Sequence, residues 1–289
     1  MILITGASGS VGREVVREML KTGEEFRAMY RSNEEAAKAP AAVKTLIADF
    51  SDEASLRKAF EGVERVFLVC SPIQELVELE GNVIEAAKKA GVKQIVLNSA
   101  LGAGDYDKSF PSWHRKVEDK LKASGMEFAI LRPNGFMQNI LAFLAPSIRA
   151  QGAFFDAMGD AKTSLVDVRD VAAVTAKALT GDGHAGKTYE LNGPEAVTQD
   201  EIAKRIAEKS GRAVKHVNIP REAHQKAMLD LGMPEWQVKA LIELQDYYVS
   251  GRAATVDGLI AKILGRPERT LDAFLTENAG EFREQAARA

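Results

Sequence analysis

The sequence predicts an α/β protein built on a doubly wound parallel sheet, followed by a smaller and mostly helical C-terminal region. Short apolar runs alternate with amphipathic helical patterns through the N-terminal part of the chain. One of these runs, residues 65–70, is almost continuously apolar, as is typical of a strand buried on both faces of a parallel sheet. Beyond Pro194, helical patterns punctuated by glycine and proline dominate.

The first expected element is a strand at residues 2–4, which runs into three glycines and then an amphipathic helix. Glycines let the backbone turn sharply and approach a pyrophosphate, and the free N–H groups of a helix start favour an anion. A second strand at residues 25–30 completes a βαβ unit of about thirty residues. This context favours a dinucleotide site over a plain tight turn, and its predicted residues are Gly6, Ser8, Gly9, Ser10, Val11 and Gly12.

The end of the second strand predicts which dinucleotide binds, because the adenosine ribose lies about 20 residues past the glycines. The chain reads Tyr30-Arg31-Ser32-Asn33 there, with no carboxylate at the strand end. A guanidinium flanked by a hydroxyl and an amide suits a 2'-phosphate. We therefore expect NADP as the cofactor through Arg31, with NAD as the alternative if Arg31 is an ordinary solvated arginine.

The next strands are expected to deliver further cofactor contacts where they end. A third strand at residues 43–48 leads to Asp49 and Phe50, and Asp49 either contacts the adenine or caps the helix at 55–60. Asp52 is the better capping candidate. The fourth strand, at 65–70, and the fifth, at 94–98, alternate with a helix at 77–90. Ligands in such sheets bind beyond the carboxyl ends of the strands, so the predicted contacts are Cys70, Ser71, Pro72, Asn98 and Ser99.

The chain then leaves the sheet and returns to it. A sixth strand at 127–131 precedes Pro133, Asn134, Gly135 and Phe136, which we expect to pass over the nicotinamide. Residues 164–168 are expected to rejoin the sheet, before a helix at 170–179 and a strand at 188–191. The predicted domains are residues 1–192, with 134–163 contributing to the cleft, and residues 193–289. In the second domain we expect a capping box from Thr198 to Glu201 and a strand at 214–219.

These motifs together resemble the NmrA-like branch of the atypical short-chain dehydrogenases/reductases. The resemblance rests on Gly6-x-x-Gly9-x-x-Gly12, Arg31, the run LRPNGFMQN at 131–139 and the run LVDVRDVA at 165–172. It implies a Rossmann domain that binds NADP or NAD, and a smaller C-terminal domain that forms one wall of a cleft. Relatives of this kind include quinone, azo-dye and triphenylmethane-dye reductases, and also redox-sensing regulators that bind the dinucleotide without turning it over.

The chain departs from the family at large at the tyrosine-lysine pair that many members use. Anchoring on Glu118 puts Phe110 at the tyrosine position and His114 at the lysine position. Phenylalanine cannot donate a proton, which disfavours tyrosine-driven alcohol dehydrogenation or sugar epimerisation. The candidate catalytic residues are therefore His114, which also could hold the nicotinamide ribose, and Ser99, which could bind the substrate or the carboxamide. The structural alternatives are a helix-start histidine and a strand-terminal serine.

Composition narrows the class of protein. The chain carries a net charge of -3 without a basic run, which disfavours nucleic acid and anionic membranes as partners. It has one cysteine and no long apolar span, so we expect a cytoplasmic protein. The four histidines are scattered, so we expect no metal site. We expect a monomer or a homodimer. We expect an NADPH-preferring reductase that transfers hydride to an electron-poor, hydrophobic and aromatic small molecule such as a quinone, azo or imine compound. The alternative is an NADPH-binding redox sensor without catalysis.

Overall fold

The computed structural model describes residues 1–283, which fall into two compact units. Unit 1 consists of Met1–Asp105, Phe110–Pro133 and Val168–Leu191. Unit 2 consists of Tyr106–Ser109, Asn134–Asp167 and the described residues from Asn192 onward. The segment 134–167 thus belongs wholly to unit 2, whereas the sequence prediction counted it within residues 1–192.

Unit 1 is a seven-stranded sheet in the order β3-β2-β1-β4-β5-β6-β8, in which every neighbouring pair is parallel. Its strands are β1 (Ile2–Ile4), β2 (Phe26–Tyr30), β3 (Lys44–Ile47), β4 (Arg65–Leu68), β5 (Gln94–Asn98), β6 (Glu127–Pro133) and β8 (Lys187–Leu191). Its helices are α1 (Ser10–Thr22), α2 (Asn33–Ala36), α3 (Glu53–Ala59), α4 (Leu76–Lys89), α5 (Ser109–Ala123) and α7 (Val168–Thr180). This α/β class and its parallel sheet are as the sequence predicts.

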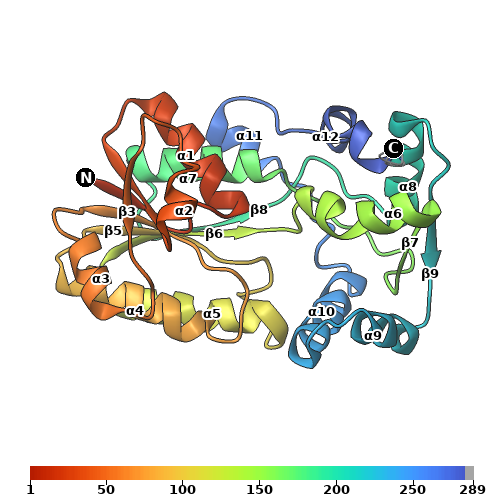
Figure 1. Ribbon diagram of the computed structural model, residues 1–289, viewed down its shortest axis with the longest axis horizontal. Helices are drawn as coiled ribbons and strands as arrows, with labels where there is room; N and C mark the ends of the chain where they lie inside the picture. The colour runs from red at the N-terminus through yellow and green to blue at the C-terminus, as the bar shows by residue number, and fades with distance from the viewer. Residues whose placement is uncertain (284–289) are drawn as a thin grey trace. The chain divides into compact units, whose positions relative to one another are not determined.

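Helices cover both faces of this sheet (Figure 1), with α1 and α7 on one side and α3, α4 and α5 on the other. The strands are short, and β1 and β5 inside the sheet are fully buried, whereas the edge strands β3 and β8 are mostly exposed. On the side of α3, α4 and α5, one apolar cluster joins the helices to the strands, with Leu56, Ile84 and Leu121 among its members. Burial of this apolar surface contributes roughly 25 cal/mol for each Å² removed from water, so the sheet is a rigid platform for the loops at its carboxyl edge.

The strand order reverses between β1 and β4, which makes the carboxyl ends of these two strands the expected ligand crevice. Thr5 joins the two strands at this point. Its hydroxyl donates to the Phe67 carbonyl at 2.9 Å and accepts from the Val69 N–H at 3.2 Å. The side chain is fully buried. Thr5 therefore fixes the place where the glycine loop begins.

Unit 2 is mostly helical and holds a small parallel sheet of two strands, β7 and β9. Its elements are the π-helix Ile140–Leu144, α6 (Ala145–Gln151), β7 (Ala153–Asp156), α8 (Gln199–Ser210), β9 (Lys215–Asn218), α9 (Arg221–Asp230), α10 (Glu235–Val249), α11 (Leu259–Leu264), α12 (Leu271–Glu277) and the 3-10 helix Ala279–Phe282. The predicted capping box is confirmed, because Thr198 and Glu201 each accept from the other's backbone N–H. The helical character of this region is also confirmed.

One predicted strand is wrong. Residues 164–168 do not rejoin the large sheet, because Val166 bridges to Phe136 and Thr163 to Val197, and all four residues belong to unit 2. The sequence analysis also missed β7, whose partner β9 lies some sixty residues further along the chain. A periodic pattern shows that a segment is extended but does not show which strand it pairs with.

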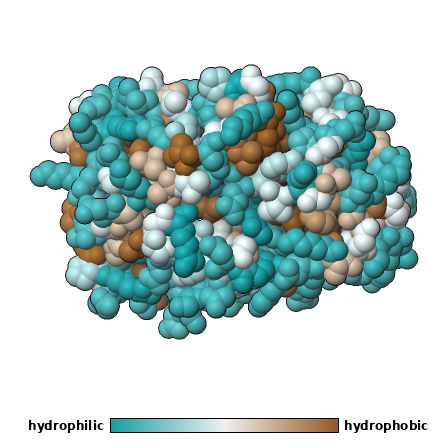
Figure 2. Space-filling model, turned by 180° about the vertical axis from the view of Figure 1, so that it is seen from behind, coloured by the Kyte–Doolittle hydropathy of each residue, from teal (hydrophilic) through white to brown (hydrophobic). Residues whose placement is uncertain are grey.

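The surface is mainly polar, and Figure 2 shows hydrophilic residues over most of one face with separate hydrophobic areas between them. Leu231 at 86% and Phe143 at 63% are the most exposed of the large apolar side chains. Single exposed apolar residues are ordinary on protein surfaces. Phe155 and Val217 are also exposed and lie opposite each other in the β7–β9 pair. Within residues 1–283, no helix has the length and apolar character needed to cross a bilayer.

Candidate functional site

The loop after β1 is shaped by its glycines. Gly6 adopts a φ of +57°, in the left-handed region that glycine tolerates best. A Cβ at Gly12 would lie 2.1 Å from the Gly6 carbonyl oxygen, and a Cβ at Gly6 would lie 2.7 Å from a methyl carbon of Val69. No side chain fits at these two positions without a shift of the backbone, so glycine lets the loop pack closely against the end of the sheet.

No side chain caps the N-terminus of α1, the helix that follows this loop. Gly9 occupies the N-cap position of α1 and has no side chain that could cap it, and the first turn holds no acidic residue. Ser8, Gly9 and Ser10 are exposed. A helix N-terminus with free N–H groups attracts anions. The glycine cradle and the uncapped helix together fit a dinucleotide pyrophosphate, as the sequence predicts for this loop.

Arg31 lies at the end of β2, where the sequence predicts it to meet a 2'-phosphate, and its side chain is 76% exposed. The structure adds a carboxylate that the sequence analysis overlooked. One oxygen of Glu35 accepts from the Ser8 hydroxyl and from the Arg31 N–H, both at 3.3 Å, and the other lies 3.8 Å from the Arg31 guanidinium. The inference that no carboxylate lies near Arg31 is therefore wrong. The signal was present as Ser32-x-x-Glu35, a capping-box pattern, and Ser32 does cap α2.

Asp49 and Phe50 follow β3 as predicted, but Asp49 does not cap the next helix. One oxygen of Asp49 accepts from the N–H and hydroxyl of Ser51, and these hydrogen bonds lower the pKa of Asp49. Asp52 caps α3 by accepting from the N–H groups of Ala54 and Ser55. The adenine contact of Asp49 stays a prediction, and so does the cofactor contact of Phe50.

Three further predicted contacts follow β4. Ser71 and Pro72 are exposed and Cys70 is half-buried. Burial, together with the nearby Glu80 carboxyl, raises the pKa of the Cys70 thiol to about 12. Cys70 is therefore a neutral thiol at physiological pH and not a thiolate nucleophile.

Beyond β5, Ser99 belongs to a buried ion-pair network. Its hydroxyl donates to Glu118 at 2.7 Å, and Arg132 from β6 donates to both oxygens of the same carboxylate, at 2.9 and 2.7 Å. Lys122 contacts Glu118 at 3.2 Å, and the Glu118 side chain is 1% exposed. Bidentate, charge-assisted contacts of this kind hold both partners in fixed positions. The network therefore locks the ends of β5 and β6 onto α5.

The charges in this network are paired. Burial alone would raise the pKa of Glu118, but hydrogen bonds from Arg132 and Ser99 outweigh it and the pKa is lowered. The same carboxylate raises the pKa of Arg132. Glu118 is thus ionised at neutral pH, and the Ser99 hydroxyl proton is already directed to it. A hydrogen bond of Ser99 to the substrate or the carboxamide stays a prediction.

His114 lies on α5 one turn before Glu118 and is 6% exposed. Burial lowers the pKa of His114 to about 4, despite the opposing pull of Glu118. His114 therefore does not titrate near neutral pH, which disfavours it as the acid of the reaction. Its Nδ1 has no hydrogen-bond partner among the described residues, and the same holds for the Oδ1 of Asn98 at the end of β5. These two buried polar atoms are free to meet a ligand in unit 1.

Phe110 and His114 are the residues that the sequence analysis places at the tyrosine and lysine positions, and that placement stays a prediction. Helix α5 contains no tyrosine between Ser109 and Ala123. Phe110 is buried and packs edge-on against Trp113, with 5.1 Å between the ring centroids. Phe110 therefore has a packing role, and this helix offers no phenol for proton transfer.

The predicted nicotinamide loop divides between the units. Pro133 ends β6 in unit 1, and its carbonyl accepts from the Leu101 N–H at 3.0 Å. Asn134 is buried in unit 2, where its amide donates to Asn192 and to the Ala253 carbonyl and its oxygen accepts from Gly135. Its polar atoms are thus engaged within unit 2. The cofactor contacts of Asn134, Gly135 and Phe136 stay predictions.

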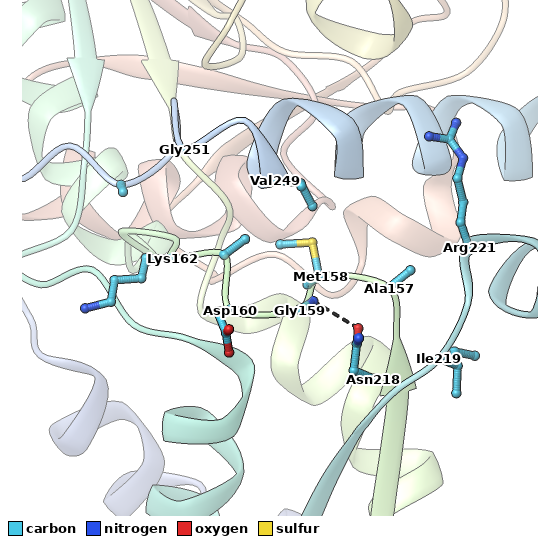
Figure 3. A pocket seen from close by; sticks show the side chains of 12 residues that line it. Ala157, Met158, Gly159, Asp160, Lys162, Asn218, Ile219, Arg221, Val249 and Gly251 are labelled. Atoms are coloured by element: carbon cyan, nitrogen blue, oxygen red, sulfur yellow. Dashed lines mark hydrogen bonds between the residues drawn. The ribbon is translucent and has the colours of Figure 1, made fainter.

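Unit 2 holds a cavity of about 640 Å³, which is within the usual range for small-molecule pockets. The apolar side chains of Met158, Ile219 and Val249 line it together with the basic side chains of Lys162 and Arg221. Figure 3 shows Met158 beside Val249, with Lys162 and Arg221 at opposite ends of the view. Asp160 also lines the cavity, and Arg221 is paired with Asp246, so the lining is mixed in charge.

Met228, Met233 and Leu241 pack in one small apolar cluster of unit 2. Among residues 1–283, no group of three or more His, Cys, Asp or Glu side chains could hold a metal ion.

Comparison with known proteins places these features in a wider group. The model of the NmrA-like family matches residues 1–275. The NAD(P)H azoreductase of Xenophilus azovorans is 35% identical over 284 residues, which cover 98% of this chain and 99% of that protein. The structure of the NADPH-dependent quinone oxidoreductase of Escherichia coli with NADPH is similar, with a TM-score of 0.89 and 32% identity over 96% of this chain and 99% of that one. The triphenylmethane reductase of Citrobacter sp. with NADP(H) has a TM-score of 0.87 and 25% identity, over 96% of this chain and 100% of that one.

Proposed function

Because the chain belongs to the NmrA-like family, we propose that it is an NAD(P)H-dependent reductase of electron-poor small molecules such as quinones, azo compounds and triphenylmethane dyes. The reduced nicotinamide supplies a hydride, and the protein supplies binding, orientation and a dry environment. The observation that carries the proposal is the glycine cradle before α1, which excludes any Cβ at Gly12 and leaves the helix start free for a pyrophosphate. Full-length relatives that reduce azo dyes and quinones support it.

Unit 1 supplies the residues that would hold the cofactor. The N–H groups at the start of α1 would bind the pyrophosphate, and Arg31 would face a 2'-phosphate. The unpartnered polar atoms of Asn98 and His114 would meet the nicotinamide riboside half. With Arg31 exposed and cationic, we propose NADPH as the preferred dinucleotide, with NADH also accepted. The relatives that bind NADPH support this preference.

The reaction that we propose does not use a strong protein acid. His114 is neutral at physiological pH, Ser99 donates to Glu118, and Phe110 replaces the phenol of the tyrosine-dependent enzymes. A quinone takes a hydride without prior protonation and becomes a hydroquinone anion, which water can protonate afterwards. An extended iminium ion becomes neutral when it takes the hydride and needs no proton. The chain's contribution is therefore to hold the donor and acceptor close and aligned, which can account for roughly 7–11 kcal/mol of a barrier.

The absence of an acid also favours the alternative, a redox sensor that binds NADPH without turning it over. A sensor needs the cradle and Arg31 but no group that serves the acceptor. Under either proposal, we expect the protein to be cytoplasmic and to act as a monomer or homodimer.

The test is consumption of NADPH and of NADH by the purified protein, with a panel of quinones, azo dyes and triphenylmethane dyes, beside a binding titration of each dinucleotide. Turnover that depends on the acceptor, with a preference for NADPH, is the expected result. Tight binding without turnover on the whole panel would establish the sensor instead. If neither dinucleotide binds, both proposals are refuted.

A further inference from the structure

We infer that Glu35 restrains the preference for NADPH and gives this chain its capacity to use NADH. The inference rests on the proposed function, since it concerns the same dinucleotide site. Glu35 opposes the 2'-phosphate and lies on the same short segment as Arg31, the cation that would bind it.

The position of Glu35 supports this role. Helix α2 is a four-residue helix whose N-cap, Ser32, follows Arg31 directly. The turn that begins there brings Glu35 back over the strand end, and its side chain is only 27% exposed. One carboxylate oxygen accepts from Ser8 and from the Arg31 N–H, and the other faces the guanidinium at 3.8 Å. The carboxylate therefore connects the glycine loop to the end of β2.

The charge of Glu35 works against a 2'-phosphate. A phosphate monoester carries close to two negative charges at pH 7. Placed beside Arg31, it would lie near the carboxylate as well, and it would have to replace the pairing between Arg31 and Glu35. The attraction of the guanidinium is thus partly offset by the neighbouring carboxylate.

The same carboxylate suits NADH. Dinucleotide sites that accept NAD place Asp or Glu about 20 residues beyond the glycines, where its oxygens accept from the ribose 2'-hydroxyl. Glu35 stands at that distance in the chain and lies against Ser8 of the loop. One of its oxygens accepts from both Ser8 and the Arg31 N–H, and a ribose hydroxyl could replace the long 3.3 Å contact to Ser8. The site thus holds Arg31 for the 2'-phosphate of NADPH and Glu35 for the ribose 2'-hydroxyl of NADH.

The test is a set of calorimetric titrations of NADPH and of NADH into the wild type and three variants, two of which remove the same charge. Glu35→Gln removes the carboxylate but keeps its size. Glu34→Gln removes the same charge from the same helix, at a side chain that is 85% exposed and paired with Lys38. Arg31→Ala removes the cation, and thermal unfolding of each variant confirms that it folds.

We expect Glu35→Gln to bind NADPH about tenfold more tightly, which corresponds to about 1.4 kcal/mol, and NADH several-fold more weakly. Glu34→Gln should leave both affinities within about twofold, because exposed charges are screened by solvent. Arg31→Ala should weaken NADPH far more than NADH. Equal changes for the two dinucleotides in Glu35→Gln, or the same shift in Glu34→Gln, would overturn the inference while leaving the proposed function intact. Failure of the wild type to bind either dinucleotide would overturn both.

Discussion

Replacing Gly12 by alanine tests the cradle directly. The added Cβ would lie 2.1 Å from the Gly6 carbonyl oxygen, whereas real Cβ contacts essentially never fall below 3.0 Å. The loop and the helix start must therefore separate by about 0.9 Å, the difference between these two distances. Because both are backbone, neither can move aside as a flexible side chain would.

That separation moves the N–H groups of α1 away from a bound pyrophosphate. Losing one hydrogen bond to a charged group costs about 1.5–3 kcal/mol, so we expect Gly12→Ala to bind NADPH about 10- to 100-fold more weakly. The assay is calorimetric titration of the purified variant, after thermal unfolding has shown that it folds. Gly280→Ala is the matched control, since a Cβ there meets nothing within 4 Å. If Gly12→Ala binds NADPH within about twofold of the wild type, the reasoning about the cradle is refuted.

Two further predictions concern the buried groups around α5. Arg132→Met should lower the free energy of unfolding by about 3 kcal/mol at pH 7, because it leaves the Glu118 carboxylate buried and without its main partner. Since the folded-state pKa of Glu118 is lowered in the wild type, its contribution is present above the ordinary carboxyl pKa and is lost as the pH falls through the folded value. The deficit measured by urea unfolding should therefore shrink in acid, and a deficit that is constant with pH contradicts this account. His114 is buried and neutral, so the wild type should lose up to about 1.4 kcal/mol of stability per pH unit as the pH falls from about 6.5 towards 4. His114→Gln, which does not titrate, should show a shallower slope in unfolding measured at pH 5 and pH 7, and an unchanged slope would mean that His114 is not held neutral.

Part of the fold could be predicted because its signals are local. The glycine spacing, the Asp52 cap and the Thr198–Glu201 capping box each depend on residues that are close in sequence, and all three appear in the structure. Apolar runs in the sequence likewise predict the short buried strands. Local chemistry was enough to place the cradle and its helix.

The rest depends on contacts that no local pattern contains. Ser99 and Glu118 are 19 residues apart in the chain, and their hydrogen bond makes Ser99 part of an ion-pair network that the sequence does not predict. The lowered pKa of His114 depends on its burial in the folded protein. Glu35 is nearer, but only the turn after Ser32 brings its carboxylate back to Arg31. Residues 134–167 belong to unit 2, and β7 within them pairs with β9, which lies far along the chain.

The proposed transfer of hydride is tested most directly with NADPH carrying deuterium at C4 of the nicotinamide, in either of its two configurations. The protein is given each form with a triphenylmethane dye that retains the transferred atom on carbon. A reductase that holds the nicotinamide in one orientation transfers deuterium from only one of the two forms, and the reduced dye carries it. Deuterium in the dye from both forms equally, or dye reduction without any deuterium from either, would contradict direct transfer at an ordered site.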